Sequence, residues 1–464
     1  MPPIARLPHG DASPDLMTKQ VRNPKGWLNC VARFLQAKNE LPSEFGAAPS
    51  TFDPANFPSW CTNEEKECGD APAANPDSIV ALVSSRGGGD WPPVVALAVG
   101  LRNRGHSVCL VCDGSIEAAV RDTGLPAICI PPHLEQGDIR LTYHRIAACG
   151  EEIGSETPNP FMEWANSCAP ALRGQIAARK PVALLSSLFC MGLADRLATD
   201  LGVPWCFVNP SFYFGESSSR SWDADFLGTS VCTFRYWFQP LLQRANLVLH
   251  ATDAAFDPFH TRLPSHHHYV GPLLWEPPMD VPEFLHTSGP SWVLVSLSTL
   301  PQDGEVAIAK AAIRALQHEA VRVLVTLAPQ QAEELGELPD NVTVSDFVPH
   351  TAVLADSRMV ISHAGHGIVM KALYHGVPMV LVPWGRDQPG VAARAEALGV
   401  ANVVTRSACD DASVAQAVRS ILYDARYMHK VREISRRLQT DDLVNTACAE
   451  LSSLWTGVAQ APKR

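Results

Sequence analysis

Short apolar runs and amphipathic segments alternate along the chain from Ser78 onward. The run Ile79–Ser84 is typical of a buried strand, whereas Pro93–Arg104 has the apolar spacing of a helix and ends just before Gly105. Further strand-like and helix-like patterns follow in turn, at 107–112, 116–123, 127–130, 182–186, 191–201, 205–209, 247–251 and 269–271. This order predicts β-α-β units that form a doubly wound parallel sheet.

The alternation starts again after a proline-rich stretch at 276–290, which is typical of a linker. Strands are predicted at 292–297, 321–326, 342–347, 359–362 and 379–382, with helices between them. We therefore expect an α/β protein with two Rossmann-like domains that face an interdomain cleft, where ligands bind at the carboxyl ends of the strands. The expected parts are an extension at 1–77, a first domain at 78–275, the linker, a second domain at 291–440, and a C-terminal helix and tail at 441–464.

Residues 1–77 are rich in Pro, Ala, Asn and Asp and lack strand alternation, which predicts a largely irregular extension. One amphipathic helix is predicted within it, at 26–41, because Trp27, Val31, Phe34 and Leu35 share one face.

Composition and charge narrow the possible partners and compartment. A net charge of -11 gives no electrostatic reason to bind nucleic acid, so neutral or hydrophobic small molecules are the expected partners. The longest apolar runs are far shorter than the roughly 18 residues that a membrane span needs. The 13 cysteines are scattered, and the one nominal C-x-x-C pair, Cys109 and Cys112, lies in an apolar strand, which predicts buried reduced thiols. The N-terminus has no secretory or transit signal, so we expect a cytoplasmic protein.

A glycine-rich loop at 363–367 is the strongest chemical motif. The predicted strand 359–362 leads into His363-Ala364-Gly365-His366-Gly367, and a helix follows. Small residues let a ligand approach the backbone, and the unpaired N–H groups of a helix start attract an anion. We expect a diphosphate here, with His363 as an additional donor; the alternative is a glycine-rich turn with an incidental histidine.

A polar pair, Asp387 and Gln388, follows the next predicted strand. A carboxylate beside a carboxamide can hold the vicinal hydroxyls of a sugar. The alternative is a solvated turn.

These segments resemble the donor-binding signature of family 1 (UDP-glycosyltransferase-like) glycosyltransferases, in the style of the bacterial antibiotic and natural-product enzymes. That signature is roughly His-small-Gly-x-Gly-Thr-x-x-Glu-Ala-Leu-x-x-Gly-Val-Pro and ends in Asp-Gln-x-x-Asn-Ala. Upstream, Phe347, Val348 and His350 are similar to the family's base-binding segment, and Ser298 and Thr299 to a turn that faces the phosphates. The resemblance implies the GT-B fold, with the C-terminal helix packing back across the domains.

Three positions depart from the signature. Lys371 stands where the family has a ribose-binding Glu, Ile368 replaces the Thr or Ser beside the phosphates, and Val391 replaces the Asn after Asp-Gln. Lys371 either reaches a ribose hydroxyl or a phosphate, or is an ordinary solvated helix residue. Phe347 replaces the commoner Trp and preserves a ring face for stacking.

The loop after the first strand, 84–93, carries the candidate base. It resembles the Arg-Gly-Asp-x-x-Pro loop of the antibiotic and sterol branches, in which the Asp aligned with Asp90 is the proposed base. Burial would have to raise the basicity of such a carboxylate. The alternative is that Asp90 caps the following helix or pairs with Arg86.

Two further groups have competing interpretations. Three consecutive histidines, His266–His268, suggest metal ligands, but their irregular context favours no metal site. A dense set of aromatic residues predicts either an acceptor pocket or hydrophobic core: Phe161, Trp164, Phe212, Tyr213, Phe214, Trp222, Phe226, Phe234, Tyr236, Trp237 and Phe238.

The resemblance implies an inverting transfer of a hexose from a nucleoside diphosphate sugar, with Asp90 as base. UDP-glucose is the favoured donor and a dTDP-sugar the second choice, and the acceptor is a hydroxyl of a small apolar or aromatic natural product. No cofactor, metal, nucleic acid or membrane span is expected, and the protein is predicted to be a monomer or homodimer. The alternatives are a sugar-nucleotide 2-epimerase of the same fold and a catalytically silent helper protein.

Overall fold

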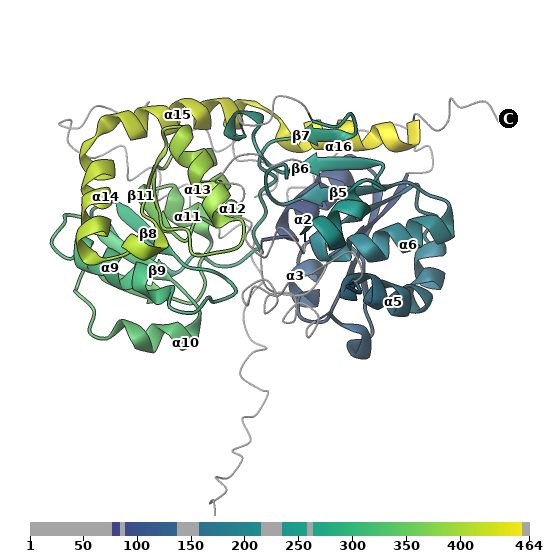
Figure 1. Cartoon of the computed structure of the whole chain (residues 1–464), viewed down its shortest axis with the longest axis horizontal. Helices are drawn as coiled ribbons and strands as arrows, with labels where there is room; N and C mark the ends of the chain where they lie inside the picture. The colour runs from purple at the N-terminus through teal and green to yellow at the C-terminus, as the bar shows by residue number, and fades with distance from the viewer. Residues whose placement is uncertain (1–76, 84–88, 137–156, 215–233, 258–262, 457–464) are drawn as a thin grey trace, which may run out of the picture.

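The computed structural model describes residues 77–83, 89–136, 157–214, 234–257 and 263–456 (Figure 1). The predicted N-terminal extension and its amphipathic helix, apart from Asp77, lie outside the described residues.

The first sheet has seven parallel strands in the order β3-β2-β1-β4-β5-β6-β7. Their bounds are β1 Ser78–Leu82, β2 Ser107–Cys112, β3 Ala127–Cys129, β4 Ala183–Ser186, β5 Trp205–Asn209, β6 Leu247–His250 and β7 His267–Tyr269. The chain leaves β1 toward β2 and later returns on the other side of β1 to form β4. Strand order therefore reverses between β1 and β4, which is where ligands bind in such sheets.

Helices bury both faces of this sheet. In β1, Ile79 and Ala81 pack on one face, and Val80 and Leu82 on the other. The main helices are α2 Pro92–Asn103, α3 Glu117–Arg121, α5 Pro160–Ala177, α6 Met191–Leu201 and α8 Gln239–Leu242. Burial on both sides explains why the strands appear in the sequence as continuous apolar runs rather than as alternating ones.

The second sheet has six parallel strands in the order β10-β9-β8-β11-β12-β13. Their bounds are β8 Trp292–Ser296, β9 Arg322–Thr326, β10 Val342–Ser345, β11 Ser357–Ser362, β12 Met379–Leu381 and β13 Ala401–Val403. The helices beside it are α9 Val306–Leu316, α10 Pro329–Ala332, α11 His350–Leu354, α12 His366–His375, α13 Gln388–Ala397 and α14 Asp411–Tyr423. The predicted fold class, two doubly wound parallel-sheet domains, is confirmed.

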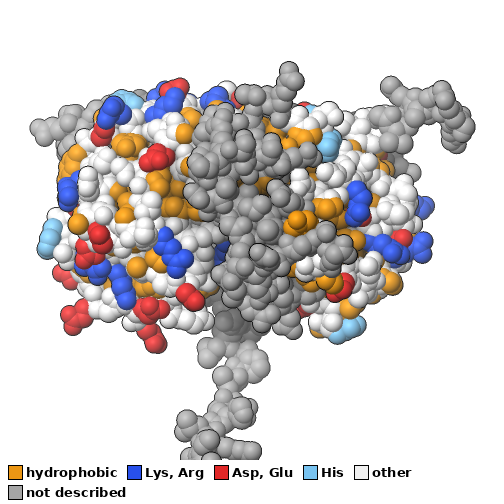
Figure 2. All heavy atoms as spheres, viewed as in Figure 1, with side chains coloured by type: hydrophobic (Ala, Val, Ile, Leu, Met, Phe, Trp, Pro, Cys, Tyr) orange, Lys and Arg blue, Asp and Glu red, His pale blue; other side chains and the backbone are white. Residues whose placement is uncertain are grey.

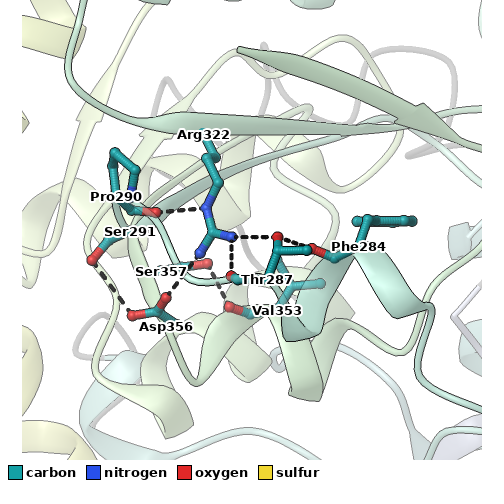
Figure 3. A network of polar contacts seen from close by, with 8 residues as sticks. All are labelled: Phe284, Thr287, Pro290, Ser291, Arg322, Val353, Asp356 and Ser357. Atoms are coloured by element: carbon teal, nitrogen blue, oxygen red, sulfur yellow. Dashed lines mark hydrogen bonds and ion pairs between the residues drawn. The ribbon is translucent and has the colours of Figure 1, made fainter. Parts of the chain in front are cut away.

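Arg322, at the start of β9, fixes the chain that enters the second sheet (Figure 3). Its Nε donates to the Pro290 carbonyl at 2.7 Å, and its Nη1 donates to the Thr287 carbonyl at 2.6 Å. Its Nη2 lies 3.4 Å from Asp356, and the guanidinium lies over the Trp292 ring at 4.2 Å. The end of the predicted linker is therefore attached firmly to the second domain.

The last two helices connect the domains a second time. Helix α15 (Ala425–Thr440) packs on α12, and α16 (Leu443–Thr456) packs on α2 of the first domain (Figure 1). The close approach of α16 to α2 requires glycine at position 100, because a Cβ atom on Gly100 would overlap Val444 Cγ1.

Basic and acidic side chains are interspersed over both domains on the face that Figure 2 shows. Among the described residues, no helix combines the length and the apolar character that a membrane crossing requires.

Candidate functional site

The candidate site lies at the carboxyl ends of β8, β11 and β12. Strand order in the second sheet reverses between β8 and β11, so the loops after these two strands form its ligand-binding edge. The loop after β11 contains His363–Gly365, and the loop after β8 contains Ser298 and Thr299. Both predicted phosphate-facing segments are thus brought together.

The loop at 363–365 leaves the N-terminus of α12 open. Gly365 is the N-cap, and no side chain caps the helix, so its first N–H groups face outward. Gly365 is required here because a Cβ atom would lie 2.5 Å from His363 Nε2. Gly367 is exposed, and a Cβ atom added to it would have no heavy atom within 4 Å. This combination suits an anion that approaches the backbone closely.

His363 is buried and its tautomer is set by the strand beside it. Its Nδ1 lies 3.2 Å from the Ser296 carbonyl, which can only accept, so Nδ1 carries the proton. Burial, assisted by the charge of Arg386, lowers the pKa of His363 to about 4, although the Ser296 carbonyl opposes this shift. At neutral pH Nε2 is therefore an acceptor, and it donates to a phosphate only after taking up a proton.

Gln302 connects the β8 loop to the β12 loop. Its Nε2 donates to Ser298 Oγ at 3.0 Å and to Gln388 Oε1 at 3.3 Å. Gln388 Oε1 also accepts the backbone N–H groups of Trp384 and Gly385, at 2.9 and 2.8 Å. These bonds fix the Gln388 carboxamide, so its NH2 group is the part that can bind a ligand.

Asp387 makes a hydrogen bond across the domain boundary. Ser211, which follows β5 of the first sheet, donates through Oγ to Asp387 Oδ2 at 2.8 Å. Burial raises the pKa of the Asp387 carboxyl, and the Ser211 hydroxyl and the charge of Arg386 oppose that rise. Ser211 belongs to no motif that indicates such a role, so this contact could not be identified from the sequence.

Two more contacts join the carboxyl-end loops of the first sheet to the site helices. The Thr252 hydroxyl donates to the Ser211 carbonyl, so it accepts from His366 Nε2 at 2.9 Å. The imidazole of His366 therefore faces the first domain, and at the predicted phosphate site this residue offers its backbone N–H. Arg394 of α13 donates to Asp257 at 2.8 Å, and both side chains are completely buried.

Lys371 forms an ion pair with Glu276, the first residue of the predicted linker, at 2.5 Å. The Glu276 carboxylate also accepts the N–H groups of His350 and Thr351, at 3.1 and 3.2 Å. Burial alone would raise the pKa of Glu276, but the Lys371 charge and the hydrogen bonds from Lys371 and Thr351 lower it to about 2. Glu276 thus fixes the start of α11 and neutralises the charge of Lys371. A contact between Lys371 and the nucleotide-sugar donor stays a prediction.

The predicted base-binding segment offers an aromatic face. The Phe347 side chain is 50% exposed, whereas Val348 is buried. His350 Nε2 lies 3.3 Å from Thr326 Oγ1 at the end of β9. The exposed Phe347 ring, next to the buried Val348 side chain, is suited to stacking on a planar base.

Asp90 lies in the loop after β1, at the reversal of strand order in the first sheet. It is 5% exposed, and the loop after the adjacent β4 carries the buried Ser187. Helix α2 has Trp91 as its N-cap and no side-chain cap, so Asp90 does not cap this helix. Arg86, the other proposed partner, lies outside the described residues.

We expected the consecutive histidines to lie in an irregular segment. This was wrong, because His267 and His268 belong to β7. Strand β7 lies at the edge of the sheet and pairs with β6. It is too short to show a clear apolar pattern in the sequence. His267 Nδ1 lies 3.0 Å from His250 Nε2, and His250 Nδ1 lies 2.8 Å from Asn209 Nδ2. Within the described segments, no group of three or more His, Cys, Asp or Glu residues has a metal-binding arrangement.

Most of the described aromatic residues proposed for an acceptor pocket belong to the core. At most 5% of the surface is exposed in Phe161, Trp164, Phe212, Trp237 and Phe238. Tyr236 is 37% exposed, and Tyr213 and Phe214 are half-buried. Trp222, Phe226 and the side chain of Phe234 lie outside what the structure describes. Among the described aromatics, the buried side chains support the core interpretation, and the acceptor pocket stays a prediction.

The buried histidines predict a loss of stability in mild acid. Burial lowers the pKa of His350 and His363 to about 4 and that of His366 to about 3. In the unfolded chain these histidines take up a proton near pH 6.5, whereas in the folded protein they stay neutral to a much lower pH. Their contribution to the free energy of unfolding is therefore fully present above pH 6.5 and is lost as the pH falls toward 4. The expected loss is roughly 2 kcal/mol per histidine at pH 5. Urea unfolding at pH 7.5, 6 and 5 measures this slope.

A matched variant tests the origin of the slope. Glutamine at 366 still offers a donor toward Thr252 but does not titrate, so His366→Gln should show a shallower loss of stability. An unchanged slope in His366→Gln, or a free energy of unfolding that is constant from pH 7.5 to 5, would contradict this prediction.

Comparison with known proteins supports the family resemblance. Residues 310–454 match the family model described as "Erythromycin biosynthesis protein CIII-like, C-terminal domain". A PGL/p-HBAD biosynthesis glycosyltransferase of Mycobacterium tuberculosis is 28% identical over 179 residues, 39% of this chain and 41% of that protein. The 4'-demethylrebeccamycin synthase of Lentzea aerocolonigenes is 30% identical over 206 residues, 42% of this chain and 47% of that protein. The matched region spans less than half the length of these relatives.

Solved structures agree over a larger part of the chain. The calicheamicin glycosyltransferase CalG4 has a TM-score of 0.62 at 20% identity, covering 84% of this chain and 100% of that one. The glycosyltransferase SnogD from Streptomyces nogalater has a TM-score of 0.61 at 18% identity, covering 82% and 99%. At such identities the likeness establishes the fold.

Proposed function

We propose that this chain, which has the GT-B fold and an EryCIII-like C-terminal domain, is an inverting glycosyltransferase. It transfers a hexose from a nucleoside diphosphate sugar to a hydroxyl group of a small apolar or aromatic natural product. UDP-glucose is the first donor to test and a dTDP-sugar the second.

The observation that carries the proposal is the set of groups around the open N-terminus of α12. The helix start at His366 and Gly367 and the turn at Ser298 and Thr299 lie at adjacent strand ends. Exposed Phe347 supplies a face for the base, and Asp387 and Gln388 supply polar groups for the sugar. A diphosphate flanked by a base and a sugar matches this order of groups.

In the proposed mechanism, the acceptor oxygen attacks the anomeric carbon from the side opposite the diphosphate, so the configuration inverts. The bond from that carbon to the diphosphate oxygen breaks, and the nucleoside diphosphate leaves with the bonding electrons. Asp90 takes the proton of the acceptor hydroxyl. The N-terminus of α12 stabilises the charge that develops on the leaving group.

The test is incubation with UDP-glucose or dTDP-glucose and a panel of phenolic and polyketide alcohols, followed by mass spectrometry. We expect a hexose adduct and an equal amount of released nucleoside diphosphate. An epimerised donor without an adduct would indicate the isomerase, and donor binding without turnover would indicate the silent helper. A chain that binds neither nucleotide would contradict the proposal altogether.

Gly367→Ala should separate folding from diphosphate binding. No protein atom lies near the added methyl group, so folding is unaffected or slightly favoured. A bound phosphate would meet it, and loss of one charged hydrogen bond weakens UDP binding about 10- to 100-fold. Calorimetric titration with UDP and a thermal unfolding curve measure the two effects.

Gly174→Ala is the matched control. Gly174 is also an exposed helical glycine without near neighbours, in α5 of the first domain. Its alanine variant should keep UDP affinity unchanged. Equal UDP affinity in Gly367→Ala and the unsubstituted protein would argue against close approach of a phosphate at Gly367.

A further inference from the structure

Arg386 lies in the loop between β12 and α13, immediately before Asp387. Its backbone has a φ of 60°, a left-handed conformation that a non-glycine residue adopts only when its surroundings require it. Its Nη2 donates to the Leu300 carbonyl in the β8 loop at 3.1 Å. The side chain therefore reaches from the β12 loop to the phosphate-facing loop after β8.

The charge of Arg386 acts on two residues of the candidate site. It helps to lower the pKa of His363, where burial is the main cause, and it opposes the rise that burial causes in the pKa of Asp387. Arg386 thus lies close enough to the loops after β11 and β12 to influence both.

His363 is neutral at pH 7, because its pKa lies at about 4. A diphosphate gains a negative charge when its bond to the sugar breaks. A cation stabilises that charge better than a neutral hydrogen-bond donor does.

We propose that Arg386 is a catalytic residue that binds the diphosphate and stabilises its charge as it leaves the sugar. The guanidinium presents several N–H donors in one plane, and this arrangement matches the oxygens of a phosphate. It complements the partial positive charge at the start of α12. This inference rests on the proposed function, since it assigns a residue to the leaving group of that reaction.

Arg386→Asn is the central variant, because asparagine tolerates a positive φ and removes the charge. We expect UDP affinity, measured by calorimetric titration, to fall about 10- to 100-fold, while uridine affinity is unchanged. The kcat for transfer should fall about 100-fold or more, and added methylguanidinium should restore part of it. Arg386→Lys, which keeps the charge without the planar fork, should retain more UDP affinity than Arg386→Asn.

Arg406→Asn is the matched control. Arg406 also contacts this loop, since its guanidinium lies over the Trp384 ring at 4.7 Å and donates to the Trp384 carbonyl at 3.3 Å. Its variant should keep UDP affinity. Equal UDP affinity in Arg386→Asn and the unsubstituted protein, or equal losses in the Asn and Lys variants, would overturn the inference while leaving the proposed function intact. An unsubstituted protein that binds neither UDP nor dTDP would instead overturn the proposed function.

Discussion

Asp90→Asn should reduce the rate of sugar transfer about 100- to 10,000-fold, the range that a positioned general base contributes. Asparagine has nearly the same shape but cannot accept the acceptor's proton. UDP affinity should not change, because Asp90 belongs to the first domain and the nucleotide groups to the second. The measurements are kcat by mass spectrometry of the adduct and UDP affinity by calorimetric titration.

Asp113→Asn is the control for this experiment. Asp113 is as buried as Asp90 and directly follows β2, the neighbour of β1. It holds its own turn by accepting from the backbone N–H of Ser115 at 3.2 Å. Full activity in Asp90→Asn, or an equal loss in Asp113→Asn, would exclude Asp90 as the base.

Arg394→Met should strongly destabilise the interface between the domains. Arg394 pairs with Asp257, both side chains are completely buried, and the guanidinium lies over the Phe212 ring at 3.6 Å. Methionine keeps much of the volume but leaves Asp257 as an uncompensated buried charge, which costs about 3 to 5 kcal/mol. The free energy of unfolding in urea at pH 7.5 measures this loss.

Two comparisons identify the cause. Arg394→Met combined with Asp257→Leu removes both charges and should recover much of the stability, because the unpaired carboxylate is gone. Arg426→Met, in the exposed pair with Asp424, should change stability little. A double variant as unstable as Arg394→Met would show that lost packing, rather than the unpaired charge, is responsible.

The fold and the position of the loop at 363–367 were predictable because they depend on local patterns. Apolar runs of strand length, followed by helical periodicity, specify β-α-β units wherever they occur. The loop at 363–367 lies between one such strand and helix, so its position at a carboxyl end of the sheet followed directly.

The contacts between the domains were not predictable in this way. Ser211 and Asp387 are 176 residues apart, and Glu276 and Lys371 are 95 residues apart. The first pair forms only when the two domains dock, and the second only when the linker packs on α12, so no local spacing indicates either pair. Glu276 was included in a proline-rich linker for the same reason, since its partners lie on α11 and α12.

The return of α16 to the first domain has a mechanical consequence. The chain crosses between the domains twice, once before β8 and once between α15 and α16. The tight approach of Val444 to Gly100 anchors the second crossing, and the Arg322 bonds to Pro290 and Thr287 anchor the first. Each crossing is therefore fixed to a domain by packing or hydrogen bonds, which limits how far the two domains can move relative to one another.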